Sequence, residues 1–375
     1  MRILTTLSNP FTHDVRVYNE AQSLVKAGHE VTVFCWDRKQ KHPQQEEKDG
    51  IHVIRSFNSS FMSILPKDIF RLHWWWRKGF KDINTLWKTS PFDVVHCHNL
   101  DTLPLGVKLK QRFHIPLIYD AHEIWGYMVE KDLPSWWAKY YLKKDKQLVQ
   151  HVDHIITVND PLQQYFQGFT GTPITQVMNC KPVKKSTYKP PTNNMFTILY
   201  IGMLAPSRCI TELIDIIGSI TKVQFLIGGM GSSSYEQQIT KHCKNHNNTK
   251  FLGKIPSDQV LPMTKESHLV VCMFHPTDRN MEVGLPNKVF EAAASGRPIL
   301  VTKGSYYEQF VVTQGKFGVS ADYDNDDIKK TIEDLRDHPQ TCEQLGKQGL
   351  KAAQTKYNWD AQERNLLKVY EGIST

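Results

Sequence analysis

The sequence predicts an α/β fold made of two facing, doubly wound parallel-sheet domains with a cleft between them. Three observations support this prediction. The chain has 375 residues, more than a single hydrophobic core usually serves. Short apolar runs alternate with amphipathic segments in both halves of the chain, which is typical of parallel strands joined by crossover helices. A polar, proline-containing stretch from Lys181 to Asn194 separates the two halves.

The first series of elements starts almost at the first residue. Ile3 to Leu7 is predicted to be a strand, Val15 to Lys26 an amphipathic helix, and Glu30 to Phe34 the next strand after a turn at Gly28-His29. Because strand, helix and strand follow one another at this spacing, a parallel crossover unit is expected. Further strands are expected at Val53-Ile54, Val94 to His96, Pro116 to Tyr119 and His154 to Val158.

The second series follows the polar stretch and repeats the pattern. Its predicted strands are Phe196 to Ile201, Val223 to Ile227, Lys250 to Leu252, Leu269 to Phe274 and Ile299 to Thr302. From about Asp326 the chain is predicted to be helical, and Trp359 opens the last amphipathic helix. Ligands bind beyond the carboxyl ends of such strands. Polar residues directly after the strands are therefore the candidates for a site.

Composition narrows the class of partner. The net charge of +8 and the isoelectric point near 8.9 favour anionic partners, whether phosphates, nucleic acid or an acidic membrane face. Seven cysteines are scattered without a Cys-x-x-Cys pair, so neither a disulfide framework nor a zinc site is expected, and a reducing cytoplasm fits best. No run approaches about 18 apolar residues, and no signal peptide is expected.

The segment between the first strand and the first helix, Asn9 to Arg16, has no Gly-x-Gly-x-x-Gly fingerprint. That fingerprint would hold the pyrophosphate of a dinucleotide at this place. Its absence argues against an ordinary NAD or FAD oxidoreductase.

The segment from Gly284 to Gly296 predicts a short buried helix with one polar stripe. Pro286 suits the first helical position and Gly296 the left-handed residue after the last. The stripe consists of Asn287, Lys288, Glu291 and Ser295. The N–H groups of the first turn, with Lys288 beside them, suit a phosphate, and Glu291 could accept from hydroxyls, which together suggest a sugar nucleotide. The alternative is that Lys288 and Glu291 simply pair along the helix.

Two polar clusters follow predicted strands of the first half, His96 to Asp101 and Asp120 to Glu123. The spacing of His96 and His98 puts both rings on one face of a strand, where they could form a metal pair, but no third ligand is apparent and a structural role is commoner. No metal is therefore expected. For Asp120 to Glu123, helix capping and a functional role are equally compatible with the local sequence.

In the second half, Arg208 follows a predicted strand and precedes a helix. A guanidinium fixed there would suit a diphosphate, because it donates two parallel hydrogen bonds. Asp322-Tyr323-Asp324 matches the Asp-x-Asp of metal-dependent sugar transferases, but it precedes a helix, so we interpret it as a helix cap.

The order and spacing of these motifs resemble a retaining glycosyltransferase of the GT-B architecture, most similar to family four. The motifs are Asp14 to Val17 with Gly28 to Val31, Asp93 to His98 with Leu100 to Pro104, Tyr119 to Glu123, Gly202 to Arg208, and Leu285 to Lys288 with Ser295-Gly296. The resemblance implies two facing Rossmann-like domains and metal-independent transfer from a nucleoside diphosphate sugar, with retained anomeric configuration and no other cofactor. The domains implied are 1–180 on the acceptor side, a linker 181–194, a nucleotide-sugar domain 195–356, and a C-terminal helix 357–375 that crosses back to the first domain.

The resemblance also implies roles for individual residues. The catalytic candidates are His122, Arg208 and Lys288. The donor-binding candidates are Gly202, Lys254, Ile255, Glu282, Val283, Gly284, Leu285, Asn287 and Glu291. The acceptor-side candidates are Phe11, Arg16, His98, Asp101 and Glu123. Two departures stand out: Val283 takes the place of a glutamate, with Glu282 one step away, and Met203 takes the place of a basic residue.

The stretch from Lys67 to Lys88 is rich in tryptophan, lysine and arginine. This mixture suits an anionic lipid interface, although it could also stack on single-stranded nucleic acid or form a helix that packs into the core. The core face of such a helix would be Ile69, Leu72, Trp76, Phe80 and Ile83. A second cluster comprises Trp125, Tyr127, Trp136, Trp137, Tyr140 and Tyr141 with Lys139, Lys143 and Lys144. We expect the chain to lie peripherally on the inner face of the cell membrane and to bind no nucleic acid.

The sequence therefore predicts a glycosyltransferase that uses a nucleoside diphosphate sugar, with UDP favoured over GDP, and a lipid-linked or cell-surface glycan precursor as acceptor. One alternative is a sugar-nucleotide epimerase of the same two-domain architecture. Another is a non-catalytic module that binds membranes or nucleic acid.

Overall fold

The computed structural model describes residues 1–12, 14–59, 61–62, 68–130 and 133–374. The chain forms two compact units. The first comprises Met1–Met178 and Gln362–Thr375, and the second comprises Asn179–Ala361. None of the described helices combines the length and the apolar character that a membrane span requires.

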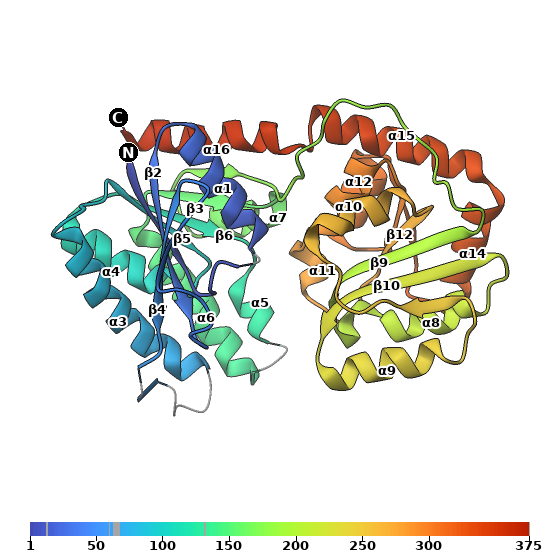
Figure 1. Ribbon diagram of the computed structural model, residues 1–375, viewed down its shortest axis with the longest axis horizontal. Helices are drawn as coiled ribbons and strands as arrows, with labels where there is room; N and C mark the ends of the chain where they lie inside the picture. Colours follow the sequence, from blue (N-terminus) through green and yellow to red (C-terminus); the bar gives the residue numbers. More distant parts are fainter. Residues whose placement is uncertain (13, 60, 63–67, 131–132, 375) are drawn as a thin grey trace. The chain divides into compact units, whose positions relative to one another are not determined.

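The first unit is built on an eight-stranded sheet (Figure 1). Its strands are β1 (Arg2–Leu7), β2 (Glu30–Asp37), β3 (Gln45–Lys48), β4 (Ile51–Phe57), β5 (Val94–His98), β6 (Leu117–Ala121), β7 (His154–Thr157) and β8 (Ile174–Gln176). They are ordered β3-β4-β2-β1-β5-β6-β7-β8, and the neighbours are parallel except for the antiparallel pair β3 and β4. The chain order reverses at β1, between β2 and β5, where a ligand-binding crevice is expected at the carboxyl ends.

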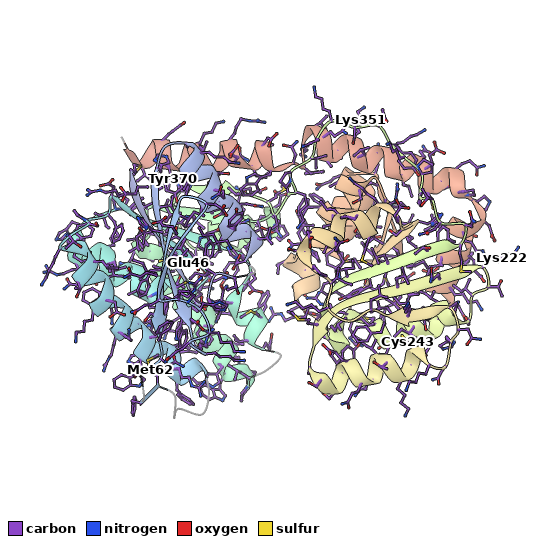
Figure 2. All side chains as sticks on the ribbon, in the orientation of Figure 1. Glu46, Met62, Lys222, Cys243, Lys351 and Tyr370 are labelled. Carbon is purple, nitrogen blue, oxygen red and sulfur yellow. The ribbon has the colours of Figure 1, made fainter. Side chains whose placement is uncertain are left out.

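Helices pack on this sheet, and one of them comes from the end of the chain. The helices are α1 (Val15–Lys26), α3 (Asp68–Trp87), α4 (Leu103–Phe113), α5 (Trp125–Val129), α6 (Ser135–Leu148), α7 (Asp160–Gln167) and α16 (Trp359–Ser374). Asp14 caps α1, because its side chain accepts a hydrogen bond from the N–H of Val17. From Gln362 onward α16 belongs to the first unit, and Tyr370 (Figure 2) reaches His96 of β5 with 2.7 Å between the hydroxyl and Nδ1.

The second unit is built on a six-stranded, all-parallel sheet. Its strands are β9 (Phe196–Leu204), β10 (Val223–Gly231), β11 (Thr249–Phe251), β12 (Leu269–Cys272), β13 (Ile299–Thr302) and β14 (Gly318–Ala321), in the order β11-β10-β9-β12-β13-β14. Its helices are α8 (Ile210–Gly218), α9 (Ser233–Cys243), α10 (Ser257–Lys265), α11 (Asn280–Val283), α12 (Asn287–Ser295), α13 (Tyr306–Glu308), α14 (Asn325–Asp337) and α15 (Pro339–Thr355). Here the chain order reverses at β9, between β10 and β12.

The structure confirms the predicted fold of two parallel-sheet units and differs in its details. Three short strands, β3, β8 and β14, were not predicted, and β3 is entirely polar because it lies at the edge of the sheet. Pro286 is the residue before α12 rather than its first residue, and Gly296 ends that helix in the left-handed conformation with φ 66°. Asp324 caps α14 by accepting from two backbone N–H groups, which agrees with the capping interpretation.

Candidate active site

Arg208 and Lys288 converge at the carboxyl end of β9 in the second unit. Arg208 ends a short turn after β9, and its guanidinium carbon lies 3.7 Å from the centroid of the Phe274 ring. Lys288 is the second residue of α12, and its Nζ lies 3.6 Å from the centroid of the Tyr200 ring on β9. Within the described part of the chain neither cation forms an ion pair. Both charges therefore stand over aromatic faces rather than against carboxylates.

Burial makes the Lys288 charge costly. Its side chain is 8% exposed, and burial lowers its pKa from 10.5 to about 8. The positive charge of Arg208 lowers this pKa as well, whereas Cys272 and Glu291 act in the opposite direction. An anion bound between the two cations would raise the Lys288 pKa again, because it would offset the charge of Arg208. The two side chains are thus arranged to favour an anionic ligand.

Gly202 makes room for the Lys288 ammonium group at the end of β9. A Cβ at this position would lie 3.2 Å from Nζ of Lys288 and 3.5 Å from its Cε. A larger residue would push the lysine away from the Tyr200 ring. The next residue, Met203, is 66% exposed and supplies no charge.

The start of α12 lies beside Lys288. Pro286 precedes the helix without a capping side chain, so the first backbone N–H groups have no side-chain partner among the described residues. Asn287 is exposed, whereas Leu285 is buried and Val283 and Gly284 are half-buried. A helix terminus of this kind carries partial positive charge that adds to the two cations.

Glu291 pairs with a residue that the sequence analysis did not single out. Its Oε1 lies 2.9 Å from Nζ of Lys181, and the two side chains are 13% and 16% exposed. The expected alternative, in which Glu291 pairs with Lys288 along the helix, is wrong in this structure. Lys181 is about 110 residues away in the sequence, so no local pattern pointed to it.

The remaining donor-binding candidates are Lys254, Ile255 and Glu282 of the second unit. Ile255 packs against the end of β10, where a Cβ at Gly228 would come within 2.4 Å of its Cγ1. Lys254 and Glu282 are exposed. Among the described residues no hydrogen bond or ion pair joins Glu282 to either cation, so its role stays a prediction.

In the first unit, a fully buried aspartate organises the candidate histidine. Asp120 accepts two hydrogen bonds from Arg16, with Nε to Oδ2 at 3.0 Å and Nη2 to Oδ1 at 2.8 Å. Its Oδ2 also lies 3.2 Å from His122 Nε2 and 3.2 Å from His98 Nδ1. The backbone N–H of His122 donates to Asn99 at 3.3 Å. His122, whose side chain is 18% exposed, is therefore held from two sides.

The electrostatics of this cluster are balanced internally. The Arg16 guanidinium holds the pKa of the Asp120 carboxyl well below its ordinary value, despite burial. Burial, together with the charge of Asp120, raises the pKa of Glu20 well above its ordinary value. Burial also lowers the pKa values of His96 and His98. The pKa shifts thus favour the charged forms of Arg16 and Asp120 and the neutral forms of Glu20 and the two histidines.

The same residues form a set of potential metal ligands. One donor atom from each of Glu20, His96, His98 and Asp120 lies within 4.8 Å of the others. The sequence analysis found only the histidine pair, since Glu20 looks like any polar residue of an amphipathic helix. Arg16 Nη2 lies 3.0 Å from Glu20 and 2.8 Å from Asp120. Because this guanidinium already supplies the positive charge, the residues do not fit a resident cation.

Four of the five acceptor-side candidates are buried, which does not support the direct contact expected of them. Phe11, Arg16 and His98 are 2%, 8% and 1% exposed, and the latter two face Asp120. Asp101 is also buried, and burial raises its pKa to about 6, with a contribution from the nearby charge of Glu123. Glu123 itself is half-buried. Among the candidates of the first unit, Glu123 and His122 are the two that are not buried.

The aromatic and basic segment forms α3, although Lys67, where the predicted segment begins, lies outside the described residues. Its buried face includes Leu72 and Ile83, as the core interpretation predicts. Trp75 rather than Trp76 is fully buried, and it stacks on Trp36 of β2 at 5.3 Å between ring centroids. The helix therefore has a core face and an exposed aromatic face.

Comparison with protein families matches both units. Residues 14–179 match the family model described as Glycosyltransferase Family 4. Residues 195–338 match the model described as Glycosyl transferases group 1. The matches cover Arg208 and Lys288 of the second unit and the Asp120 cluster of the first.

Individual relatives are distant but extend over the whole chain. Spore coat protein SA of Bacillus subtilis (strain 168) is 23% identical over 391 aligned residues, covering 95% of this chain and 94% of that protein. The structure of sucrose-phosphate synthase from Thermosynechococcus elongatus is similar with a TM-score of 0.81 at 16% identity, covering 100% and 99% of the two chains. Anabaena HepE in complex with UDP-glucose is similar with a TM-score of 0.74 at 14% identity, covering 99% and 100%. At these identities the structural likeness shows the fold.

Proposed function

We propose that this chain, which belongs to the GT-B glycosyltransferases of the family four type, transfers a sugar from a UDP-sugar to a lipid-linked or cell-surface glycan precursor with retention of configuration. The observation that carries the proposal is the pair Arg208 and Lys288, which meet at the end of β9 without an ion pair among the described residues. UDP is favoured because HepE, a structural neighbour, binds UDP-glucose.

In this proposal the two cations stabilise the leaving diphosphate. Negative charge grows on the diphosphate as the bond to the sugar breaks, and the sugar carbon becomes positively charged. Arg208 can donate two parallel hydrogen bonds to phosphate oxygens, and Lys288 adds a point charge from a buried position. The N–H groups at the start of α12 would face the same phosphate. Glu291, fixed by Lys181, would accept hydrogen bonds from the ribose hydroxyls.

His122 is proposed to contact the donor sugar near the reacting carbon. Because the ionised Asp120 can only accept hydrogen bonds, Nε2 of His122 must carry the proton that faces it. Asp120 thereby fixes the tautomer of the ring. No metal takes part in this scheme, and the leaving phosphate oxygen takes the proton from the attacking acceptor hydroxyl.

The membrane part of the proposal rests on exposed aromatic side chains of the first unit. The large exposed hydrophobic residues on or next to α3 and on α6 are Phe61, Phe70, Trp74, Trp136 and Tyr140. Tryptophan and tyrosine, interleaved with lysine and arginine, are typical of the interface with anionic lipid headgroups. We expect the chain to sediment with anionic vesicles at low salt and to stay in the supernatant with zwitterionic ones. Equal behaviour with both vesicle types would remove this part of the proposal.

Ligand screening tests the enzymatic part. UDP should raise the melting temperature more than GDP, ADP or dTDP at equal concentration, because a ligand that binds the native state stabilises it by mass action. Incubation with UDP-sugars and an acceptor extract should then release UDP and give a glycosylated product. Conversion of the UDP-sugar without acceptor into its epimer would show the epimerase instead. Failure of every nucleotide to shift the melting temperature would contradict the proposed donor site.

A further inference from the structure

The two aromatic clusters of the first unit, which are far apart in sequence, line one groove. Helices α3 and α4 pack together, as do α4 and α6 (Figure 1). Between them lies a hollow of about 360 Å³. Its lining comes from α3 (Phe70, Leu72, His73, Trp74 and Trp76), from Leu100 before α4 and Pro104 within it, and from α6 (Trp137, Tyr140, Tyr141, Lys144 and Leu148).

The walls of this groove are largely apolar and aromatic. The indole N–H of Trp76 donates to the backbone oxygen of Asp101 at 2.6 Å, so the ring turns its hydrocarbon surface to the hollow. Trp137 packs between neighbouring aromatic rings of α6, 5.7 Å from Tyr140 and 6.0 Å from Tyr141 between centroids. A volume of this size lined by aromatic side chains is in the range of pockets that hold small organic ligands.

The rim of the groove is positively charged. Lys144 is one of the lining residues, and none of the described lining residues is acidic. The positive charges of Arg77 and Lys108 both act on His73 in the lining, and with burial they lower its pKa. Arg77 also lies over the ring of Trp74 at 5.1 Å. An apolar hollow with cations at its mouth is complementary to a molecule with a hydrocarbon tail and an anionic head.

We propose that the groove between α3, α4 and α6 binds the hydrocarbon chain of an anionic membrane lipid, with the lipid phosphate at Lys144 and the cations beside His73. The inference rests on the membrane-facing part of the proposed function and adds a specific lipid site to it. The protein would then contact the membrane in two ways. Exposed aromatic rings would contact lipid headgroups at the surface, and one hydrocarbon chain would leave the bilayer and bind in the groove.

Monomeric alkyl phosphates test the groove without a membrane. We expect octyl phosphate and decyl phosphate, each below its critical micelle concentration, to bind with one-to-one stoichiometry in isothermal titration calorimetry. Decyl phosphate should bind about 15-fold more tightly, because each of its two further methylene groups contributes about fourfold when buried. The heat-capacity change should be negative, since apolar surface is buried. Inorganic phosphate should not bind at the same concentrations.

Adjacent tryptophans provide a matched pair of variants. Trp137 lines the groove, whereas the neighbouring Trp136 is 59% exposed and is not part of the lining. Trp137→Ala should weaken decyl phosphate binding at least tenfold. Trp136→Ala removes a ring that stacks on Trp137 at 4.5 Å between centroids without lining the groove, so it should weaken this binding much less than Trp137→Ala does while weakening sedimentation with anionic vesicles. Lys144→Ala, at the rim, should weaken alkyl phosphate binding without affecting the fold. UDP binding, measured on every variant, should stay unchanged, and an unchanged melting temperature of the transition that includes the first unit shows that this unit is folded.

Three results would overturn the inference. The first is no saturable binding of either alkyl phosphate, and the second is an affinity that does not depend on chain length. The third is equal loss of affinity in the Trp136 and Trp137 variants, which would show adsorption to the surface. Because none of these measurements uses transfer activity, each result leaves the proposed donor site to be judged by UDP binding alone.

Discussion

Replacing Lys288 by methionine should make the free protein more stable and its nucleotide binding weaker. The pKa that falls from 10.5 to about 8 on burial corresponds to about 3 kcal/mol against the charged form at about 1.4 kcal/mol per pKa step. Methionine keeps the apolar stem and can contact the Tyr200 ring, but the cation–π contact, worth about 1 kcal/mol, is lost. The net gain is therefore about 2 kcal/mol at pH 7.

Calorimetric unfolding measures this gain. For a unit of this size, about 2 kcal/mol corresponds to a rise of about 4 to 8 °C in the melting temperature of the transition that includes the second unit. The gain should be constant below pH 8. As the pH rises from 8 to 10.5, native Lys288 loses its proton before the unfolded chain does, so the wild-type protein becomes relatively more stable. The advantage of Lys288→Met should therefore shrink over this interval and vanish above it.

Nucleotide binding should move in the opposite direction. Loss of one charge-assisted contact to a phosphate costs about 2 to 3 kcal/mol, so the Kd for UDP should rise about 30- to 150-fold. Lys351→Met, which removes an exposed lysine of α15, serves as the control and should change neither quantity. The reasoning would be refuted by a Lys288→Met protein that is less stable than wild type at pH 7, or by one that binds UDP as tightly as wild type.

Three further changes test other contacts of the two sites. Arg208→Lys keeps the charge but loses the two-pronged donor, so turnover should fall about 100-fold in a product assay; turnover within threefold of wild type would contradict a diphosphate contact. Gly202→Val should weaken UDP binding in calorimetry, because the Cβ of the valine would lie 3.2 Å from Nζ of Lys288 and displace it. An unchanged Kd for UDP would show that the position of the Lys288 ammonium group does not depend on Gly202. Asp120→Ala should lower the free energy of unfolding by about 3 to 5 kcal/mol in urea, since it removes the carboxylate that accepts two hydrogen bonds from the buried Arg16. A loss below about 1 kcal/mol would contradict the charge balance described for this cluster.

The sequence was sufficient for the features that local patterns encode. Alternating apolar runs predict β1 and β9, and the polar stripe of α12 points to Lys288. The structure confirms that the other faces of α12 are buried, including Val289 and Phe290. Such features depend on residues within one turn or one strand, so their spacing can be read directly.

Contacts between distant segments could not be predicted in this way. Glu291 meets Lys181, and Trp137 meets the aromatic residues of α3 around one groove, because the topology of the sheet brings these segments together. Glu20 joined the buried cluster unexpectedly, since one glutamate on an amphipathic helix carries no sign of burial. In α3 the fully buried tryptophan is Trp75, whereas the sequence predicted Trp76. Because three successive residues are tryptophans, the spacing of apolar residues cannot show which of them faces the core.

The hydrophobic core of the first unit is complete only when α16 is packed against it. Leu366, Val369 and Tyr370 of α16 are almost completely buried, and they belong to the unit that begins at Met1. During synthesis these residues leave the ribosome only after the whole of the second unit, so the N-terminal sheet keeps an uncovered apolar face until α16 has been made. A chaperone that shields such surfaces would have its main task during this interval, and severing α16 before Gln362 would make that waiting state permanent.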